Sequence, residues 1–575
     1  MLGEKVIVFW LKSANSGDIM KYIKSFLISL FFQLFLFFAL GKAGWHCFKN
    51  IQFNNPDSYY TMDLFYQHQV NHAILGSNPM ILGSHLSWIH WSSFYLYLIN
   101  GLSLLLENVF SIERSIEVAS ALLTFVPSTV LGFVFSLFML SYVRSYLIIF
   151  VFEFILFVNE YIMGYANILS LTHHMLMICI SGLFLFSVLM KEAKYYISGI
   201  LATLSLWVSP EVFPLVLSGL GIYAFRYHNI SKVACIWFVS SLFIVLCDPN
   251  PPTMPWYAPD RLDLCYVILA GLIMSSTFFF RNEIILLLSL SFSTALWMFI
   301  IPHLHEGVHG FIPVSVYQEW YRHVSEILPS QINILFFEKL FTPACIYLTA
   351  LYVSIRKENL LFLYLCLITG IYFCMGIFHY RSMLEFELVN TIFSFYILSH
   401  TQLFQNSMKN LIICVVGVSL SINSLYFTKT FINYQCDNTQ QLEDFFKKHQ
   451  TSHILNIIDE SPKILWVLKE DHVKTFAGPY HRDSESINNE FRIFRTYPES
   501  PTYKEDMRLL DKYHIDYIVL KKDETTTFEY FQWKHFNYFM GLLNSNKKIP
   551  HNIKYVGYFG NYKIYQVLHP TMNVD

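Results

Sequence analysis

Apolar segments of about twenty residues recur through this 575-residue chain as far as residue 427. A helix of that length crosses the roughly 30 Å hydrocarbon core of a bilayer. Only helices and closed barrels satisfy every backbone polar group in lipid, so long apolar segments in series indicate a helical bundle. Hydrophobic residues make up 54% of the chain and charged residues only 14%, which agrees with this interpretation. We therefore expect a polytopic α-helical membrane protein.

Lysine and arginine indicate the orientation of these segments, because both residues concentrate in the cytoplasmic loops of membrane proteins. The N-terminal tail is basic, and basic residues recur at points that leave room for two spans between them. The pattern predicts about thirteen transmembrane helices, with the N-terminus in the cytoplasm and the C-terminus outside. These helices are expected near residues 25–41, 117–142, 146–160, 173–190, 196–209, 212–225, 233–247, 264–280, 283–301, 338–355, 359–378, 384–403 and 410–427.

One apolar segment, Ser93 to Leu106, does not fit as a span, because counting it would invert every later loop. We interpret it as an amphipathic helix on the outer face, with Trp88 and Trp91 at the level of the headgroups. Two long outer loops then follow, at residues 42–116 and 302–336.

The last part of the chain has a different character. Polar residues predominate after about residue 428, and short strand-like segments at 453–458 and 517–520 alternate with helix-like ones. Alternation at this spacing is typical of a small α/β domain with a partly parallel sheet. We therefore expect a transmembrane domain at residues 1–427 and a soluble α/β domain at residues 428–575.

Composition also narrows the classes of partner. The net charge of −2 gives no reason to expect binding to nucleic acid. The ten cysteines are scattered, mostly within apolar segments, and none forms a Cys-x-x-Cys pair. Neither a zinc site nor a redox motif is therefore indicated.

A polar segment, Asn54 to Asp63, follows the first predicted helix. Asp57 and Asp63 within it are candidate oxygen ligands for a divalent cation, for which Mg²⁺ or Mn²⁺ is suited. Such a cation would neutralise a pyrophosphate leaving group. The alternative for Asp57 is structural, because Asn-Pro-Asp-Ser is also a favourable turn sequence.

Further polar residues fall on the same predicted face of the membrane. His173 and His174 begin a helix, and the alternative to a ligand role is hydrogen bonding at the interface. Glu211 interrupts an apolar hairpin, where an acidic residue is costly unless it is solvated or paired, and helix capping is its alternative. Arg381 lies in a short outer turn, where it either holds an anion or reaches toward the interface. The other members of this set are His90, Glu160, Asp263 and Glu326.

With these residues in place, the chain resembles the GT-C glycosyltransferase superfamily, in particular the catalytic subunits of oligosaccharyltransferase. It also resembles a group of proteobacterial inner-membrane proteins that share a series of short motifs. The matching segments are Ile89 to Ser93 (Met-His-Trp-Ser-Arg in the group), Thr172 to His174 (Asp-His-His), Trp207 to Glu211 (Trp-Val-Ser-Pro-Glu), Val324 to Pro329 (Val-Ser-Glu-x-x-Pro) and Ala477 to Asp483 (Ala-Gly-Pro-Tyr-His-Arg-Asn).

The resemblance implies an enzyme of the bacterial inner membrane that transfers a sugar or glycan from a polyprenyl-phosphate-linked donor at the periplasmic face. Asp57 and Glu211 would be catalytic, and His90, Glu326 and Arg381 would act on the donor and the flexible loop. A Mg²⁺ or Mn²⁺ ion would bind Asp57, His173 and His174. The membrane lipid and the lipid-linked donor are the implied partners, together with an acceptor that the sequence does not identify.

The sequence departs from the motifs at two positions, and it leaves two rival functions open. Thr172 stands where the group has Asp, which removes an acidic ligand, and Ser93 replaces Arg. The Trp-Trp-Asp motif of oligosaccharyltransferases is not visible in the tail. The rivals are a transporter or flippase for lipid-linked glycans, which we would expect to carry charges or broken helices at mid-bilayer depth in two related halves, and a catalytically inactive scaffold of the same fold.

Overall fold

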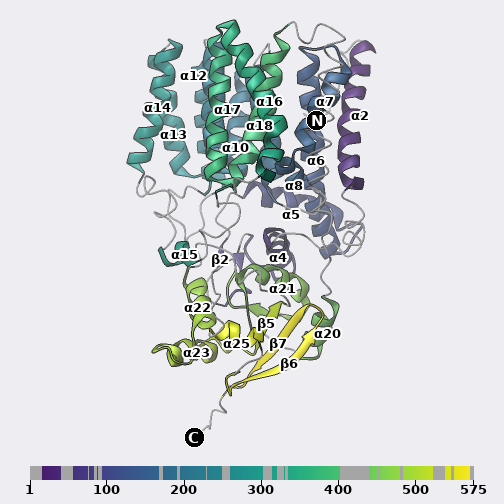
Figure 1. The fold of residues 1–575 in the computed structure, drawn as a ribbon, viewed down its shortest axis with the longest axis vertical. Helices are drawn as coiled ribbons and strands as arrows, with labels where there is room; N and C mark the ends of the chain where they lie inside the picture. Colours follow the sequence, from purple (N-terminus) through teal and green to yellow (C-terminus); the bar gives the residue numbers. More distant parts are fainter. Residues whose placement is uncertain are drawn as a thin grey trace.

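In the computed structural model, a bundle of long helices stands above a smaller domain built on a five-stranded sheet (Figure 1). The structure describes residues 16–39, 56–75, 77–82, 87–88, 93–166, 172–190, 194–227, 229–248, 260–280, 282–301, 314–319, 329–330, 334–401, 417, 439–449, 453–478, 484–521, 538–545 and 549–569.

Twelve of the thirteen predicted segments are α-helices, and the last, 410–427, lies outside the described residues except for residue 417. The helices are α2 (Ser16–Ala39), α6 (Ile112–Leu140), α7 (Tyr146–Val158), α9 (His174–Leu189), α10 (Tyr195–Val208), α11 (Phe213–Arg226), α12 (Ile230–Cys247), α13 (Leu264–Phe279), α14 (Glu283–Ile300), α16 (Ile334–Lys357), α17 (Leu360–Phe378) and α18 (Met383–Ser399). Among the described helices, α6, α12, α14 and α17 are both long and apolar enough to cross a membrane. The count of thirteen spans remains a prediction.

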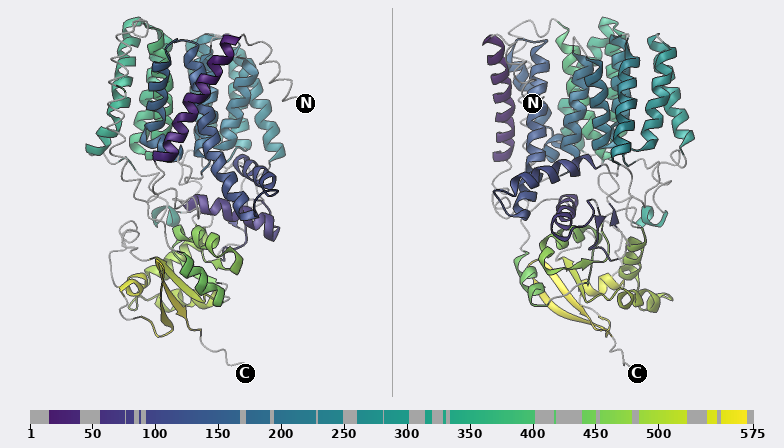
Figure 2. Two further views of the ribbon diagram at one scale, coloured as in Figure 1. Left: turned by 90° about the vertical axis from the view of Figure 1, so that its right-hand side faces the viewer. Right: turned by 180° about the vertical axis from the view of Figure 1, so that it is seen from behind.

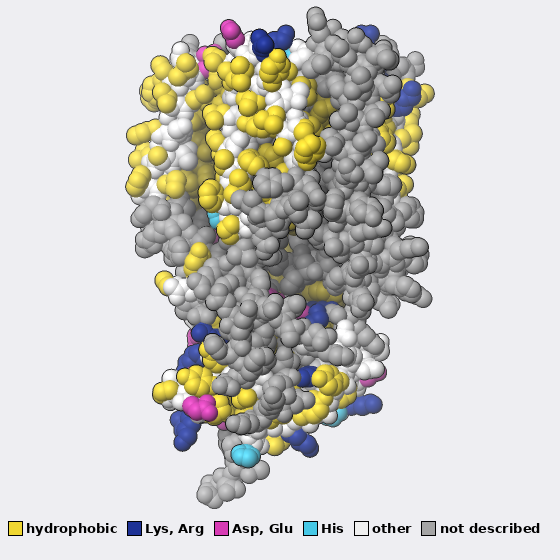
Figure 3. All heavy atoms as spheres, in the orientation of Figure 1, with side chains coloured by type: hydrophobic (Ala, Val, Ile, Leu, Met, Phe, Trp, Pro, Cys, Tyr) yellow, Lys and Arg dark blue, Asp and Glu magenta, His cyan; other side chains and the backbone are white. Residues whose placement is uncertain are grey.

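The two ends of the bundle differ in chemistry. The polar turns η1 (Pro210–Val212) and η4 (Tyr380–Ser382) join α10 to α11 and α17 to α18, whereas α11 and α16 end on the basic residues Arg226 and Lys357. Apolar side chains cover the described flank of the bundle in Figure 3, and Lys and Arg gather at its end away from the sheet domain. The sheet domain therefore lies at the end of the bundle opposite to the basic one.

The described part of residues 42–116, the segment predicted as the first outer loop, is mostly helical. Helix α4 (Pro56–Asn71) comes first, strands β1 (Ser77–Asn78) and β2 (Ser87–Trp88) pair antiparallel, and α5 (Phe94–Leu106) follows. Helix α5 agrees with the helix expected there, and Figure 2 places it between the bundle and the sheet domain. Pro56 is the first residue of α4, a position that suits its fixed φ angle and missing N–H group, so the backbone of Asp57 lies in the first turn of a helix and the role of its side chain stays a prediction.

The C-terminal sheet has the strand order β4-β3-β5-β7-β6. Strand β3 pairs parallel with β4 and β5, while β7 pairs antiparallel with β5 and β6, so the sheet is partly parallel, as expected. The strands are β3 (His453–Asn456), β4 (Lys474–Thr475), β5 (Tyr517–Lys521), β6 (Ile553–Phe559) and β7 (Tyr562–Val567). The main helices are α20 (Gln440–Lys448), α21 (Ser461–Val467), α22 (Ser484–Arg495), α23 (Tyr503–Lys512) and α25 (Phe539–Ser545).

Helices cover both faces of this sheet, because successive strand residues point to opposite sides. Leu455 and Ile518 belong to an apolar cluster with residues of α22, α23 and α25. Their neighbours Ile454 and Val519 belong to a second cluster with residues of α20 and α21. The domain therefore has the three-layer arrangement that a sheet buried on both faces requires.

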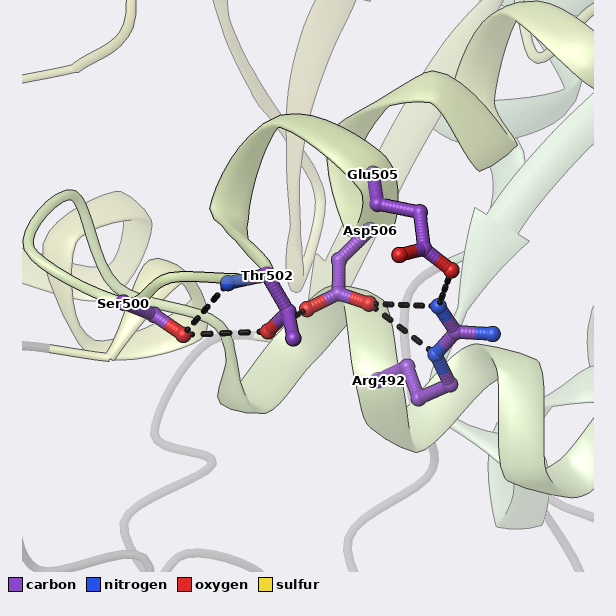
Figure 4. A network of polar contacts seen from close by, with 5 residues as sticks. All are labelled: Arg492, Ser500, Thr502, Glu505 and Asp506. Atoms are coloured by element: carbon purple, nitrogen blue, oxygen red, sulfur yellow. Dashed lines mark hydrogen bonds and ion pairs between the residues drawn. The ribbon is translucent and has the colours of Figure 1, made fainter.

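A polar network fastens α22 to α23 at the edge of this domain (Figure 4). Arg492 donates hydrogen bonds to Asp506 at 2.9 Å and to Glu505 at 2.8 Å. Thr502 donates to the other carboxylate oxygen of Asp506 at 2.7 Å. Asp506 is buried while Glu505 is exposed, so the network closes the outer side of the helix pair.

Candidate functional site

Two polar turns meet at the end of the bundle that faces the sheet domain. The guanidinium Nη2 of Arg381, in η4, lies 3.1 Å from the carboxylate Oε2 of Glu211, in η1. The Glu211 side chain is 49% exposed and that of Arg381 is 23% exposed, so solvent reaches the pair. Two of the residues selected from the sequence are thus brought together from positions 170 residues apart. A guanidinium in such a turn is well suited to hold a phosphate or carboxylate.

The paired histidines lie within electrostatic range of this ion pair. Arg381 interacts electrostatically with both His173 and His174, at the start of α9. The His174 ring stacks on the ring of Tyr165, with ring centroids 4.6 Å apart. The centroids of the His173 and His174 rings are 4.4 Å apart. Tyr165 belongs to α8 (Glu160–Ala166), so α8, α9 and η4 converge here. His174 is buried, in keeping with a role inside the bundle end.

A second carboxylate joins the cluster, and the sequence analysis missed it. Glu385 is buried in the first turn of α18 and interacts electrostatically with Glu211 and Arg381. The sequence could have indicated this contact, because Glu385 follows Arg381 by four positions and residues four apart are neighbours on a helical surface. Arg381 therefore pairs with one exposed acidic residue and lies within electrostatic range of a second, buried one.

The start of α13 borders the same cluster. Asp263 caps this helix by accepting a hydrogen bond from the backbone N–H of Cys265 at 2.7 Å. Tyr266, one turn into the helix, interacts electrostatically with Asp263, Asp260 and Glu211. The capping bond gives Asp263 a structural role, while its charge adds to the acidic border of the cluster.

A buried ion pair fixes the segments around this cluster, and the sequence analysis did not identify it. Arg261 donates a hydrogen bond to Asp248 at 2.6 Å and another to Ser93 at 2.9 Å. The other carboxylate oxygen of Asp248 accepts a hydrogen bond from the Trp207 indole at 2.9 Å. The pair therefore links the start of α5, the end of α10 and the end of α12. Arg261 also brings in the segment just before Asp263.

Helix α4 carries Asp57 as its second residue and Asp63 two turns later. Positions six apart fall on different faces of a helix, so the helix disfavours a cation shared between these two residues. Asp63 is buried, and its two carboxylate oxygens accept hydrogen bonds from Gln67 at 3.1 Å and from Asn78 at 2.8 Å. Burial raises the pKa of Asp63 to about 6, opposed by these hydrogen bonds and by the positive charge of Lys469.

Several sequence-selected positions lie outside what the structure describes. They are the residues His90 and Glu326, the side chains of Asp57 and Glu160, and residues 479–483 of the Gly-Pro-Tyr-His-Arg element. Their proposed roles stay predictions.

The described residues do not by themselves assemble a metal centre. Within those ranges, no group of three or more His, Cys, Asp or Glu side chains is arranged to hold a metal ion. His173 and His174 supply imidazole nitrogens, and Asp57 is the remaining predicted ligand. A Mg²⁺ or Mn²⁺ site therefore requires the Asp57 carboxylate, or another oxygen ligand from outside the described residues, beside this pair.

Comparison with known proteins places the fold. No family model matches the chain, and no curated protein sequence matches it. The structure is similar to that of the oligosaccharyltransferase AglB from the archaeon Archaeoglobus fulgidus in complex with an inhibitory peptide and a dolichol-phosphate, with a TM-score of 0.66 and 14% sequence identity. The similarity covers 88% of this chain and 70% of AglB.

A second structure of the A. fulgidus enzyme, complexed with Zn and sulfate, gives a TM-score of 0.62 at 14% identity and covers 94% of this chain and 73% of that one. At such low identity the similarity establishes the fold alone. The expected architecture is thereby confirmed in its main feature, a helical bundle joined to a C-terminal sheet domain. The chain therefore shares the fold of this archaeal oligosaccharyltransferase, in agreement with the GT-C-like architecture expected from the sequence.

Proposed function

We propose that this chain is a membrane glycosyltransferase that transfers a sugar or glycan from a polyprenyl-phosphate-linked donor. The observation that carries the proposal is the Arg381–Glu211 pair beside His173 and His174, at the end of a GT-C-type bundle next to the sheet domain. The similar archaeal enzyme was solved with a dolichol-phosphate, a lipid carrier of the class proposed here. Membrane lipid and the lipid-linked donor are thus the proposed partners, and the acceptor is left open.

The proposed reaction exchanges one bond at the anomeric carbon of the donor sugar. The bond from this carbon to the phosphate oxygen breaks, and a bond to a nucleophilic atom of the acceptor forms. The acceptor proton passes to a carboxylate, for which we propose Asp57 or Glu211. The electron pair leaves with the polyprenyl phosphate or diphosphate, whose negative charge Arg381 stabilises through two parallel N–H···O bonds. Arg381 must exchange its bond to Glu211 for the phosphate, which leaves Glu211 available as a base.

The remaining residues have supporting roles in this proposal. His90 and Glu326 would contact the donor or the loop that encloses it. A Mg²⁺ or Mn²⁺ ion held by Asp57, His173 and His174 would supply positive charge to the leaving phosphate.

For the cellular setting, we propose the bacterial inner membrane, with the N-terminus in the cytoplasm and the C-terminal domain in the periplasm. Residues 1–427 would form the transmembrane domain, including outer loops at 42–116 and 302–336, and residues 428–575 the soluble domain. The basic helix ends opposite the sheet domain support this orientation, because basic residues concentrate on the cytoplasmic side.

The test uses the purified full-length chain in liposomes with two radiolabelled probes, a polyprenyl-monophosphate-linked and a polyprenyl-diphosphate-linked disaccharide. With water as the acceptor, we expect release of the free lipid phosphate and of the free disaccharide from at least one probe, and a much lower release at subsaturating probe in Arg381→Ala. Arg356→Ala is the matched control, because Arg356 is a basic residue in the last turn of α16, at the end of the bundle away from Arg381. Its activity should equal that of the parent protein.

The rival functions give distinct outcomes in the same liposomes. Transbilayer movement of an intact probe, without cleavage, would identify a lipid-linked glycan transporter. Neither cleavage nor movement of any probe, in a protein that is folded by its thermal transition, would identify an inactive scaffold. Either result would overturn the proposed enzyme.

A further inference from the structure

The segment at residues 77–82, which follows α4, shares backbone hydrogen bonds with the sheet domain. Ile81 forms a parallel bridge with Thr475 of β4, at the edge of the sheet. The Thr475 N–H donates to the Met80 carbonyl at 3.0 Å, and the Leu82 N–H donates to the Thr475 carbonyl at 2.8 Å. The segment thus continues the sheet beyond its edge strand, in the manner of an added strand.

Asn78, in the same segment, joins this bridge to α4. Its side chain is buried, and its amide oxygen accepts a hydrogen bond from the Met80 N–H at 3.0 Å. Its amide nitrogen donates to the Asp63 carboxylate at 2.8 Å. A backbone N–H is a donor and an ionised carboxylate is an acceptor, so an amide, which is both, can connect the two. Hydrogen bonds therefore run without a break from β4 to a side chain of α4.

The same series of hydrogen bonds continues along one side of α4. The other oxygen of the Asp63 carboxylate accepts a hydrogen bond from Gln67 at 3.1 Å, and the Gln67 amide oxygen accepts one from Asn71 at 2.7 Å. These three residues are spaced four apart, so they form a row on the helix surface. We call the whole series the amide relay; its members are Thr475, Met80, Asn78, Asp63, Gln67 and Asn71.

Another side of α4 packs directly against α21. Tyr66 of α4 meets Trp466 of α21 edge-to-face, with ring centroids 6.3 Å apart. Trp466 is buried in the same apolar cluster as residues of α4 and of the bundle. Nearer the start of α4, the ring centroid of Tyr59 lies 5.8 Å from the ammonium of Lys463. The sheet domain therefore contacts α4 through these rings as well as through the amide relay.

We propose that Asn78 is a positioning residue, which couples the sheet domain to α4 and so fixes the rotation of the helix whose second residue is Asp57. Apolar packing is non-directional, whereas a hydrogen bond needs its donor and acceptor aligned, so the amide relay sets this rotation more sharply than the ring contacts do. The inference rests on the proposed function, because it gives the sheet domain a part in orienting a proposed catalytic residue. Asn78 itself needs no contact with substrate.

The amide relay can be broken and rebuilt by exchanging two side chains. Asn78→Asp keeps an acceptor for the Met80 N–H but places a second carboxylate against that of Asp63. Adding Asp63→Asn restores a donor opposite an acceptor, with the two chemical groups in exchanged places. The single variant should therefore loosen α4, and the double variant should hold it as the parent protein does.

The measurement is hydrogen exchange of the α4 amides in the full-length protein, which needs no donor sugar. It is made at pH 8.5, to remove a proton that two carboxylates could share. Asn78→Asp should speed exchange over residues 58–71 by about tenfold or more, because a hydrogen bond to a charged group is lost. Asn489→Asp is the matched control, because Asn489 is a buried amide of the sheet domain that donates to the Tyr513 hydroxyl at 3.4 Å and takes no part in the relay. Its exchange over α4 should equal that of the parent.

Two proline variants test the part of the sheet domain in this coupling. Thr475→Pro and Leu82→Pro each remove one of the two N–H donors of the bridge, and an edge strand tolerates proline. Each should speed exchange over α4 by about twofold to tenfold, although neither changes a residue of that helix. Leu82→Pro leaves β4 itself unaltered, so its exchange over β5 should stay at the parent rate. Unchanged α4 exchange in both variants would overturn the coupling to the sheet domain.

A further measurement joins the inference to the proposed activity. If the parent cleaves either probe, Asn78→Asp should lower kcat with little change in donor KM, and adding Asp63→Asn should recover it. Equal exchange in Asn78→Asp and the parent, or an increase that Asp63→Asn does not reverse, would overturn the positioning role. A parent protein that cleaves no probe but shows the exchange pattern would overturn only the proposed function.

Discussion

Arg381 and Glu211 form a 3.1 Å ion pair between the turns that join α17 to α18 and α10 to α11. The pair occupies the guanidinium with an internal carboxylate, and the buried side chain of Glu385 lies within electrostatic range of both residues. A phosphate must therefore compete with Glu211 for Arg381. We expect Arg381 to affect mainly the binding of the donor, and Glu211 its cleavage.

Kinetic constants separate these two roles. Arg381→Ala should raise the donor KM by about tenfold to a hundredfold for each of the two hydrogen bonds to the phosphate that it loses. Arg381→Lys should recover part of this loss, since it keeps the charge without the planar fork. Glu211→Gln should instead lower kcat and leave KM equal or lower, because Arg381 is no longer held. Initial rates with the radiolabelled probes measure both constants, and equal KM values for Arg381→Ala and the parent would contradict the role of Arg381.

The buried Arg261–Asp248 pair predicts a large effect on stability. Arg261→Leu leaves the Asp248 carboxylate buried without its partner, which should cost about 3–5 kcal/mol in the free energy of unfolding. Replacing both residues by Leu should cost less than the sum of the two single changes. Glu505→Ala is the control, because its pair with Arg492 is exposed and should contribute about 0–1 kcal/mol. Unfolding in mild detergent measures all four variants, and additive effects at Arg261 and Asp248 would contradict coupling between them.

The raised pKa of Asp63 predicts how stability depends on pH. The pKa is about 6 in the folded protein, above its ordinary value of 3.8, so the folded state binds the proton more tightly. Between these values, stability falls as the pH rises, and above pH 6 the buried carboxylate costs up to about 3 kcal/mol. Asp63→Asn should remove this slope. Thermal midpoints of both proteins at pH 5 and pH 7.5 provide the measurement, and an unchanged difference between the two pH values would contradict the prediction.

Reporter fusions test the orientation in the membrane. A reporter fused after residue 430 should be active in the periplasm, whereas fusions near Lys194 or Lys357 should be active in the cytoplasm. Lys357 ends α16 on the basic side of the bundle, which supports this assignment. A cytoplasmic tail would rule out both the odd helix count and the periplasmic site.

Removal of divalent cations tests the proposed metal. Treatment with EDTA should abolish cleavage of the probes, and added Mg²⁺ or Mn²⁺ should restore it. Asp57→Ala should then require a higher concentration of the cation for half-maximal activity. Activity that withstands EDTA would remove the metal role from Asp57, His173 and His174 while leaving that of Arg381 intact.

The helices could be predicted from the sequence because the bilayer imposes a length on each apolar segment. Helix α4 lacks such a signal. Its buried residues Tyr59, Tyr60 and Met62 lie among polar ones, and they share an apolar cluster with residues of α21, some 400 positions later. The sequence therefore predicted either a turn or a cation ligand at Asp57, and not the start of a helix.

The residues of the site could likewise be predicted only where the nearby sequence marks them. Arg381 and Glu211 stood out because charges are rare in an apolar hairpin, and the structure brings them together. The Arg261–Asp248 pair lies across a Pro-rich segment, and nothing in that segment indicates which carboxylate Arg261 meets. Pairing of this kind is set by the packing of several helix ends, which a single sequence does not encode locally.

The bridge between Ile81 and Thr475 also constrains how the protein is made. Its second residue follows the first by 394 positions in the chain. At a synthesis rate of about 5–20 residues per second, the ribosome needs roughly 20–80 seconds to reach it. Throughout that interval Tyr59 and Tyr66 have no α21 to pack against. The nascent first loop is therefore a site where a chaperone outside the membrane, or a neighbouring unfinished chain, can bind before the native partner arrives.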